Sequence, residues 1–245
     1  QIEPMSNVSV FRGNELTAED VLAIGADAVV LATGATWLRN GVGRNSSEAF
    51  FGADNLQVFS PDDIMNGIYP DAGPVLLYDD DGFYLASVLA EVLVQRGHQV
   101  HYVTPEDVIA GWTSNTLDYR HIQKRLRKLG VHFHTSKSLQ SFDGQYAKIA
   151  CGYSDQIEEL AVNAIVSVSM RLPNDGLYQS LLLCQDQWQD AGIQSVDCIG
   201  DALAPSLIAH AVYAGHRYAR EFEAELDENG GNAEVPFKRI RHVMS

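Results

Sequence analysis

Residues 75–87 read VLLYDDDGFYLAS, an apolar run that passes through three consecutive aspartates into a segment with apolar residues at helical spacing. The apolar run over 75–78 predicts a buried strand, and the segment 83–96 predicts a helix that ends at Gly97. A second apolar stretch over 99–104 predicts the next strand. Strand, helix and strand in this order indicate a unit of a parallel sheet, so this stretch decides the fold class.

The same alternation extends along the rest of the chain. Residues 28–32 form an apolar run beside glycine that suits a strand covered on both faces, and Thr17 with Asp20 forms a capping-box pattern for a short helix over 17–24. Segment 39–74 is rich in Gly, Asn, Ser, Asp and Pro and should be mostly loop. Further elements are expected as a helix opening at 60–61, a helix over 117–129, a strand over 131–135, a hairpin over 139–151, a strand over 162–170, a short helix within 174–183, a strand within 192–202 and a helix over 205–226.

The composition argues against several classes of protein. The chain has 245 residues and carries 32 acidic against 17 basic residues, a net charge of −15, which argues against nucleic acid as a partner because phosphate binding needs a basic surface. No apolar run approaches the roughly 18 residues of a membrane span, and the opening QIEPMSNVSV lacks the features of a signal peptide. Cys151, Cys184 and Cys198 lie far apart without a CxxC pair, so we expect no disulfide framework, no thiolate metal site and a cytoplasmic location.

The three aspartates at 79–81 form an acidic junction between the predicted strand and the predicted helix. A dinucleotide-binding unit carries the glycines of a GxGxxG pattern at this place. Register with the strand over 75–78 puts Asp79, Asp81 and Tyr84 at the three glycine places. Two unit charges about 4 Å apart repel by about 1 kcal/mol in water and by more at a partly buried site. The acidic residue that hydrogen-bonds the ribose in such a unit is replaced here by Thr104, which is uncharged. The junction is therefore expected not to bind a pyrophosphate.

Two interpretations of the three aspartates are open. Carboxylate clusters suit Mg²⁺ or Ca²⁺, which would make the junction a divalent-metal site. Alternatively, the aspartates cap the positive N-terminal end of the following helix, and the junction is a degenerate nucleotide site kept for its fold. The second interpretation is favoured, and we expect no metal in this chain.

Several further stretches carry a family resemblance. LATG (31–34) and CIGDA (198–202) each end an apolar strand, as in flavoproteins with two dinucleotide-binding domains. The run GDALAPSLIAHAVYAGHRYAREFE (200–223), with LTAEDVLAIGADAVVLATGA (16–35) and VPFKR (235–239), resembles the C-terminal region of the trimethylamine, dimethylamine and histamine dehydrogenase family, which is related more distantly to 2,4-dienoyl-CoA reductase. The resemblance spans nearly the whole chain.

The resemblance implies an oxidoreductase of which this chain is a C-terminal fragment. Members of the family begin with an old-yellow-enzyme-like barrel that holds FMN and a 4Fe–4S cluster, followed by two Rossmann-like domains, one nested in the other. The FAD- or ADP-binding-like domain would be incomplete here and comprise 1–70 and 161–245, and the nested NAD(P)-binding-like domain would comprise 71–160. The implied reaction is oxidative demethylation or deamination of a small amine in the barrel, so this chain alone would be inactive.

The resemblance also implies which residues would meet a nucleotide. Thr33, Gly34, Gly200 and Asp201 would form a weak site for ADP or FAD. Family members that use NADPH keep the glycines of the nested domain and a Gly after its last strand, where this chain has Met170. Together with the lost glycine pattern, this argues against a nicotinamide cofactor. The alternative functions are a stand-alone module that binds an adenine nucleotide and an NAD(P)H-dependent reductase domain.

A basic helix stands out from the acidic chain and could dock a partner. The partners implied by the resemblance are the family's own N-terminal barrel and an electron-transfer flavoprotein with an acidic surface. The alternative interpretation is a solvated helix face. The residues concerned are Arg120, Lys124, Arg125, Arg127 and Lys128, with Tyr119 at a position that matches the amine dehydrogenases.

The FAD-like domain lacks its first strand–helix unit with GxGxxG, which should precede residue 1. A parallel sheet without that strand leaves backbone groups unpaired beside 29–32 or 196–199, and such an edge can pair with another chain. We therefore expect the segment 2–12 to cover the edge, or the chain to form homo-oligomers through it.

Overall fold

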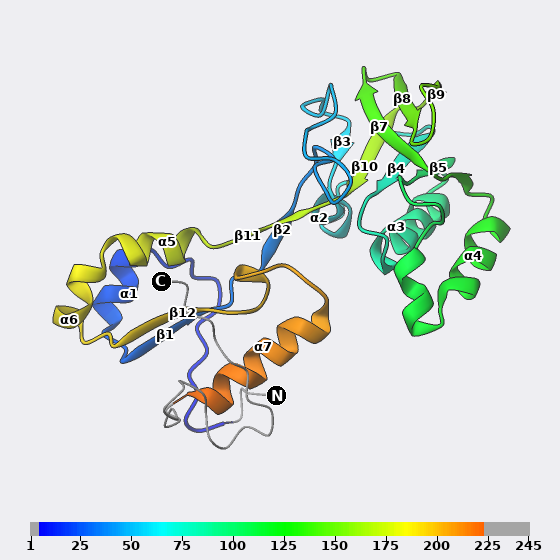
Figure 1. The fold of residues 1–245 in the computed structure, drawn as a ribbon. Helices are drawn as coiled ribbons and strands as arrows, with labels where there is room; N and C mark the ends of the chain where they lie inside the picture. Colours follow the sequence, from blue (N-terminus) through cyan, green and yellow to red (C-terminus); the bar gives the residue numbers. More distant parts are fainter. Residues whose placement is uncertain (1–4, 223–245) are drawn as a thin grey trace. The chain divides into compact units, whose positions relative to one another are not determined.

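The computed structural model describes residues 5–222, and their contacts divide them into two compact units. The nested unit comprises residues 36–172, and the outer unit comprises the described residues up to 35 and from 173 onward. β2 (Ala35–Trp37) and β11 (Arg171–Pro173) pair where the chain leaves the outer unit and returns to it. Figure 1 shows this single excursion of the chain through β2 and back through β11.

A parallel sheet is the centre of the nested unit. Its five strands lie in the order β3, β10, β4, β5, β6. β4 and β10 are buried over their whole length, because strands in the middle of a parallel sheet are covered on both faces. The bounds are Val58–Phe59 for β3, Val75–Asp79 for β4, Val100–Val103 for β5, His132–His134 for β6 and Ala164–Val168 for β10.

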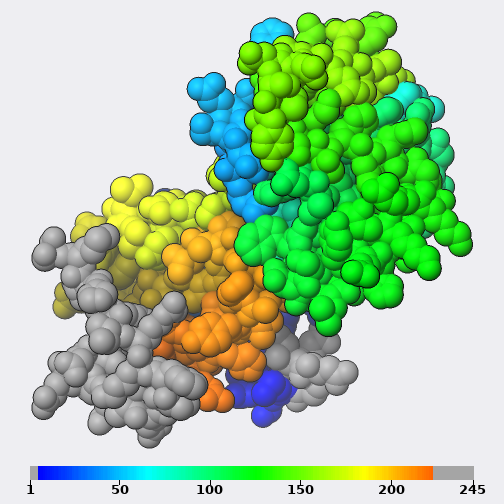
Figure 2. Space-filling view, turned by 45° about the vertical axis from the view of Figure 1, so that its right-hand side comes forward, coloured from blue at the N-terminus to red at the C-terminus, as the bar shows by residue number. Residues whose placement is uncertain are grey.

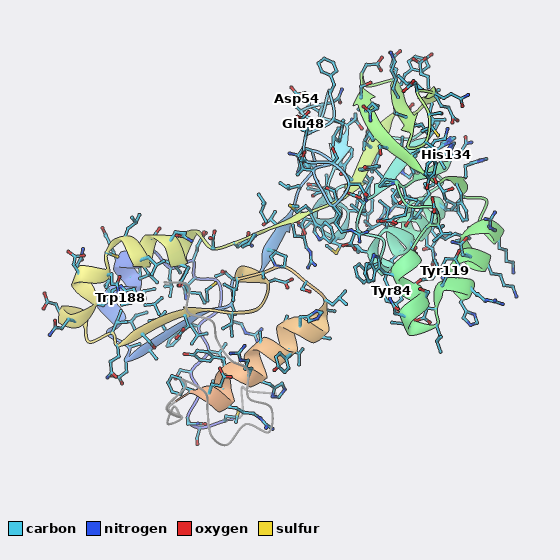
Figure 3. All side chains as sticks on the ribbon, viewed as in Figure 1. Glu48, Asp54, Tyr84, Tyr119, His134 and Trp188 are labelled. Atoms are coloured by element: carbon cyan, nitrogen blue, oxygen red, sulfur yellow. The ribbon has the colours of Figure 1, made fainter. Side chains whose placement is uncertain are left out.

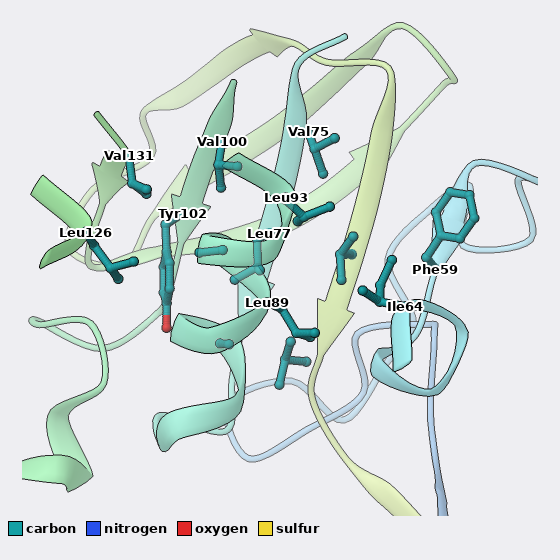
Figure 4. Packing of buried hydrophobic residues seen from close by; sticks show 14 of the residues in the cluster. Phe59, Ile64, Val75, Leu77, Leu89, Leu93, Val100, Tyr102, Leu126 and Val131 are labelled. Atoms are coloured by element: carbon teal, nitrogen blue, oxygen red, sulfur yellow. The ribbon is translucent and has the colours of Figure 1, made fainter. Parts of the chain in front are cut away.

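Helices cover one face of this sheet and close an apolar core. They are α2 (Pro61–Met65), α3 (Tyr84–Gln95) and α4 (Tyr119–Lys128). Ser60 caps α2 in a capping box with Asp63, in keeping with the helix expected to open at 60–61. The side chains labelled in this core in Figure 4 are Phe59, Ile64, Val75, Leu77, Leu89, Leu93, Val100, Tyr102, Leu126 and Val131.

An antiparallel sheet packs on the opposite face. It consists of β7 (Lys137–Phe142), β8 (Tyr146–Cys151) and β9 (Ile157–Ala161). The pairing of β7 with β8 confirms the hairpin expected from the sequence. β9 was not expected, because Leu160 alone is buried along it and its apolar pattern is weak. The second core joins Leu76, Tyr78, Val103 and Ile165 of the parallel sheet to Leu139, Phe142 and Ile149 of the antiparallel one.

The outer unit is built on β1 (Ala28–Leu31), which pairs in parallel with β12 (Ser195–Cys198). α1 (Ala18–Ile24) follows Thr17, and Thr17 and Asp20 form the reciprocal hydrogen bonds of the predicted capping box. The core of the unit joins Val21, Leu31, Leu181, Ile193 and Val196. The remaining elements are α5 (Gly176–Leu183), η2 (Gln185–Gln187), α6 (Trp188–Ala191), η3 (Gly200–Ala202) and α7 (Ile208–Glu221).

The nested unit is wider than the stretch 71–160 expected for the nested domain. β3 and β10 belong to its sheet, and Phe51 forms a parallel bridge with Ser141 of β7. The N–H of Trp37 donates to Asp62 at 2.8 Å, which fixes the start of the unit to α2. The changes between units fall at 35–36 and 172–173, within β2 and β11.

Three stretches named in the sequence analysis reach beyond the described residues. They are residues 2–4 of the segment expected to cover the sheet edge, residues 223–226 of the expected last helix, and the VPFKR stretch. Residues 5–12 add no strand, so β1 and β12 form a sheet of two strands in the described chain. Within residues 5–222, none of the helices has the length and apolar character that crossing a membrane requires.

Candidate functional site

The acidic junction lies at the carboxyl end of β4, where the strand leads into α3. Asp79 is the last residue of β4 and is completely buried. Its Oδ1 accepts hydrogen bonds from the N–H groups of Asp81 (3.1 Å) and Gly82 (2.9 Å), and its Oδ2 accepts one from the hydroxyl of Tyr102 (2.5 Å). The side chain of Asp79 therefore holds the turn between β4 and α3 from the inside.

Burial controls the protonation of this carboxyl. It raises the pKa of Asp79 to about 7, although the hydrogen bonds from Tyr102 and Gly82 act in the other direction. Tyr102 is also completely buried, and burial together with the charge of Asp79 raises its pKa well above the ordinary value. A phosphate beside Asp79 would add a second negative charge to a place that already disfavours the first.

The segment 43–45 covers Asp80, the second residue of the junction. Asn45 donates to both carboxylate oxygens of Asp80, from its backbone N–H at 3.0 Å and from Nδ2 at 2.6 Å. Arg44 Nε donates to the backbone carbonyl of Asp80 at 3.0 Å. A Cβ on Gly43 would lie 2.1 Å from Asp80 Oδ2, so the close approach requires glycine. The chain thus packs its own backbone against the end of β4.

Asp81 is partly buried and lies among positive charges. Burial raises its pKa, while the charges of Arg171 and Arg44 and the N–H of Phe83 lower it. The expectation that aspartates cap α3 is wrong, because the N-cap residue is Phe83 and no side chain caps it. Gly82, with φ of 73°, turns the chain before the helix, so the carboxylates of Asp79 and Asp81 bind N–H groups of the turn instead.

Two stacked aromatic side chains, Phe83 and Trp112, form an aromatic shelf beside the junction. Trp112, in η1 (Gly111–Thr116), stacks on Phe83 with 5.5 Å between ring centroids, and the guanidinium of Arg44 lies 5.7 Å from the centre of the Trp112 ring. Arg44 also pairs with Glu106 at 3.3 Å. A small pocket of about 180 Å³ opens beside this shelf, lined by Glu106, Gly111, Trp112, Ser114 and Asn115.

The other two positions where glycine is replaced lie apart from the junction. The hydroxyl of Tyr84 donates to Asp118 at 2.6 Å and also contacts Thr116, so this side chain points to the start of α4 (Figure 3). Met170 lies between β10 and β11 and is exposed, and its carbonyl accepts the N–H of Leu38 at 2.8 Å. The structure therefore brings Asp79 and Asp81 together and leaves Tyr84 and Met170 elsewhere.

No metal cluster forms around the three aspartates. Asp79 faces the turn and Tyr102, Asp80 faces Asn45, and Asp81 faces Phe83. In the described part of the chain, no group of three or more His, Cys, Asp or Glu side chains is arranged to hold a metal ion.

The proposed nucleotide-contacting residues of the outer unit gather at the end of the β1–β12 sheet. Leu31 pairs with Cys198, so the segments after both strands emerge at the same edge. The hydroxyl of Thr33 donates to the carbonyl of Asn174 at 2.5 Å, and Asp201 accepts the N–H of Ser206 at 3.0 Å. Gly34 and Gly200 have φ of 77° and 62°, and the space beside the Cα of Gly34 is open. The side chains of Thr33 and Asp201 are engaged within the chain, while a Cβ at Gly200 would be in ordinary contact with Ala211.

The basic helix α4 is exposed along most of its length. Leu126 is its buried residue, and Tyr119 at its start is half-buried. Arg125 pairs with Glu91 of α3 at 2.6 Å, and the guanidinium of Arg127 lies 4.5 Å from the ring centre of Phe133. Arg120, Lys124 and Lys128 are exposed on the same helix, which belongs to the green part of the surface in Figure 2.

Sequence reasoning missed the segment 43–45 and Trp112. Asn45 and Asp80 are 35 positions apart, and the stretch around Asn45 reads as loop, so no local pattern connects the two residues. One signal was available: Asp80 follows a buried strand and has no basic neighbour in sequence. A buried carboxylate needs donors from somewhere in the fold, and that requirement could have directed attention to distant amides.

Comparison with known proteins identifies relatives of the chain, although no protein-family model matches it. It is 29% identical over 244 residues to dimethylamine dehydrogenase of Hyphomicrobium sp. (strain x), covering 91% of this chain and 32% of the relative. Histamine dehydrogenase from Rhizobium sp. 4-9 matches with a TM-score of 0.90 and 36% identity over 100% of this chain and 35% of that one. The 6-hydroxypseudooxynicotine amine oxidase from Pseudomonas geniculata N1 matches with a TM-score of 0.87 and 34% identity over 91% and 33% of the two chains.

These matches confirm the resemblance to amine dehydrogenases and the fold class. The chain is homologous to part of oxidoreductases that act on amines, and it spans about a third of their length. The fold is Rossmann-like α/β, and a flavoprotein disulfide reductase from Escherichia coli shares it at a TM-score of 0.53 and 15% identity, a likeness of fold alone.

Proposed function

We propose that the chain is the C-terminal part of an amine dehydrogenase that uses FMN and a 4Fe–4S cluster. Its reaction would be the oxidative demethylation or deamination of a small amine, with both redox groups held in the part of the enzyme outside this chain. The observation that carries the proposal is the match to histamine dehydrogenase along the whole chain at 36% identity, with only a third of that enzyme covered. On this proposal the chain alone does not catalyse the reaction.

The nested unit would serve as a scaffold and would bind neither NADH nor NADPH. Two completely buried aspartates stand at the end of β4, and the segment 43–45 packs against one of them. The residues at this place therefore do not fit a dinucleotide phosphate, which needs glycine backbone and N–H donors free to bind it. This misfit supports an enzyme that delivers its electrons to another acceptor.

The outer unit would provide a weak site for ADP or the ADP part of FAD. Gly34 and Gly200 place backbone with left-handed φ at the edge of the β1–β12 sheet, where nucleotides bind in open parallel sheets. Thr33 and Asp201 would hold the loops that carry these glycines in place. Thr33 donates a hydrogen bond to Asn174, and Asp201 accepts one from Ser206.

The electron acceptor would be a flavoprotein with an acidic surface that docks on α4. Exposed basic residues are concentrated on α4, whereas the chain as a whole has a net charge of −15. The helix would therefore form a region of positive potential on an acidic protein. Tyr119, Lys124 and Arg127 would lie in the contact. Association of this kind is fast at low salt and slows as salt screens the charges.

The proposal is tested with the complete gene product that contains this chain. Methylated amines and histamine are added anaerobically, and bleaching of the flavin absorbance band is followed. Bleaching by one of these amines is expected, with no bleaching by NADPH. Rapid bleaching by NADPH with none by any amine would overturn the proposal in favour of a reductase. The isolated chain should show no amine-dependent reduction of an artificial dye.

A further inference from the structure

Three histidines occupy one face of the nested unit's parallel sheet, at its β6 edge. His132 and His134 lie two positions apart on β6, and His101 of β5 stands opposite His132 in the strand register. Residues two apart on a strand point to the same face, so the three side chains share one surface. The His101 ring stacks on His132 with 5.1 Å between centroids and lies 5.3 Å from the ring of His134. Nothing in the proposed amine dehydrogenase reaction uses this group.

Two ring nitrogens within the group face each other at the spacing of joint metal ligands. Nδ1 of His101 lies 3.1 Å from Nε2 of His134, which is labelled in Figure 3. Zinc binds imidazole nitrogen at about 2.0–2.1 Å, so two ligands separated by a tetrahedral or a right angle lie roughly 2.9 to 3.4 Å apart. His101 pairs with His132 in the register of β5 and β6, and His134 lies two residues further along β6, so the His101 and His134 side chains meet diagonally across the two strands.

A carboxylate supports one member of the pair from behind. Glu158 of β9 lies 3.7 Å from Nδ1 of His134, the ring nitrogen that does not face His101, and Nζ of Lys137 of β7 lies 2.5 Å from the other carboxylate oxygen of Glu158. Metal-binding histidines commonly direct their second ring nitrogen to a carboxylate, which fixes the tautomer and the ring orientation. With its proton on Nδ1, His134 presents the lone pair of Nε2 to His101.

The two rings can both offer a lone pair to a shared ion. A neutral imidazole is the form that binds metals, and each ring has one nitrogen facing the other ring. Without metal the two nitrogens share a hydrogen bond. Metal binding would move the His101 proton from Nδ1 to Nε2, so that both facing nitrogens offer lone pairs and the charge of each ring is unchanged.

We propose that His101 Nδ1 and His134 Nε2 bind one divalent late transition-metal ion, with water completing its coordination. Imidazole ligands suit Zn²⁺, Cu²⁺ and Ni²⁺ better than Mg²⁺ or Ca²⁺. The site has two protein ligands, in keeping with the lack of a group of three or more metal-binding side chains in residues 5–222. His132 is exposed beside the pair and forms a contact with Gln99 at 3.2 Å.

Calorimetric titration of the full chain with ZnCl₂, after removal of metals with a chelator, tests the proposal. The expected result is one ion per chain at micromolar affinity. His101→Gln and His134→Gln should each weaken binding by about tenfold or more, and Glu158→Gln by about tenfold, as for other supporting carboxylates. His121→Gln, which changes an exposed histidine on α4, is the matched control and should bind as the wild type does.

Circular dichroism melting curves would establish that each variant is folded, and Zn²⁺ should raise the melting temperature of the wild type more than that of His101→Gln. Three results would overturn the proposal. The first is equal Zn²⁺ affinity of the wild type and His101→Gln. The second is loss of Zn²⁺ binding in His132→Gln alone, which would assign the binding to an exposed histidine, and the third is the lack of saturable binding below millimolar Zn²⁺, which would leave the pair as an ordinary hydrogen bond.

Discussion

Asn45 holds both carboxylate oxygens of Asp80, one through its backbone N–H at 3.0 Å and the other through its side-chain amide at 2.6 Å. The two residues are 35 positions apart, and their contact seats the segment 43–45 against the end of β4. A dinucleotide would need the same end of the strand for its phosphates. The contact therefore links the packing of this loop to the proposed lack of nicotinamide binding.

Gly43→Ala should lower the free energy of unfolding by about 1–3 kcal/mol, the usual cost of forcing an extra methyl group into a packed place. The new Cβ would lie 2.1 Å from Asp80 Oδ2 and would push the segment away. Urea denaturation measures the loss, and hydrogen exchange at Asn45 should become faster. Gly176→Ala is the control, because a Cβ there meets no atom within 4 Å. Equal stability of Gly43→Ala and the wild type would mean that the segment does not pack as described.

Asp79 should make the chain less stable as the pH rises. Its pKa is about 7 in the folded chain, against 3.8 as the ordinary value, so the folded chain binds this proton more tightly than the unfolded chain does. The contribution of the protonated Asp79 carboxyl to the free energy of unfolding is fully present below about pH 4. It is lost as the pH rises to 7, by up to about 4 kcal/mol for about three pKa units. Denaturation at pH 5 and pH 8 measures the difference.

Asp79→Asn should remove most of that pH dependence, since a neutral amide can accept the N–H groups of the turn without carrying a charge. Asp54→Asn, which changes an exposed carboxylate, should keep the wild-type slope. A wild-type slope in Asp79→Asn would assign the pH dependence to other groups.

The basic helix should contribute to docking of the electron acceptor. In the complete enzyme, Lys124→Glu combined with Arg127→Glu is expected to slow reduction of an acidic flavoprotein several-fold at low salt, with a smaller effect at high salt. Stopped-flow kinetics at several ionic strengths measures both. Lys148→Glu, on β8 of the same unit, reverses an exposed charge away from α4 and is the control. Unchanged rates and salt dependence in the double variant would make α4 a solvated face only.

The isolated chain should associate through the edges of the β1–β12 sheet. The described residues provide two strands there, so each strand has one edge without a partner. Unpaired N–H and C=O groups on such an edge favour pairing with another chain. Light scattering should show species larger than a monomer, and amides of residues 28–34 should be protected from exchange. A strictly monomeric, folded chain with those amides unprotected would contradict this expectation.

The sequence predicted local structure well and side-chain partners poorly. The capping box of Thr17 with Asp20 and the helix start at Ser60 follow from residues close in sequence, and the alternation around 75–104 predicts β4, α3 and β5. The donors to Asp80 come from a segment that reads as loop, and the side chain of Tyr84 turns to Asp118 although the fingerprint register places it at the junction. Short-range patterns determine which elements form, whereas tertiary packing determines which polar groups meet.

Calorimetric titration of the chain with NADH and NADPH measures whether the nested unit binds a nicotinamide cofactor. We expect no heat of binding for either cofactor, because Asp79 and Asp80 are completely buried and the segment 43–45 lies against the end of β4. Saturable binding of either cofactor with a micromolar dissociation constant would contradict this claim, because a dinucleotide would then bind although the glycine positions carry aspartates.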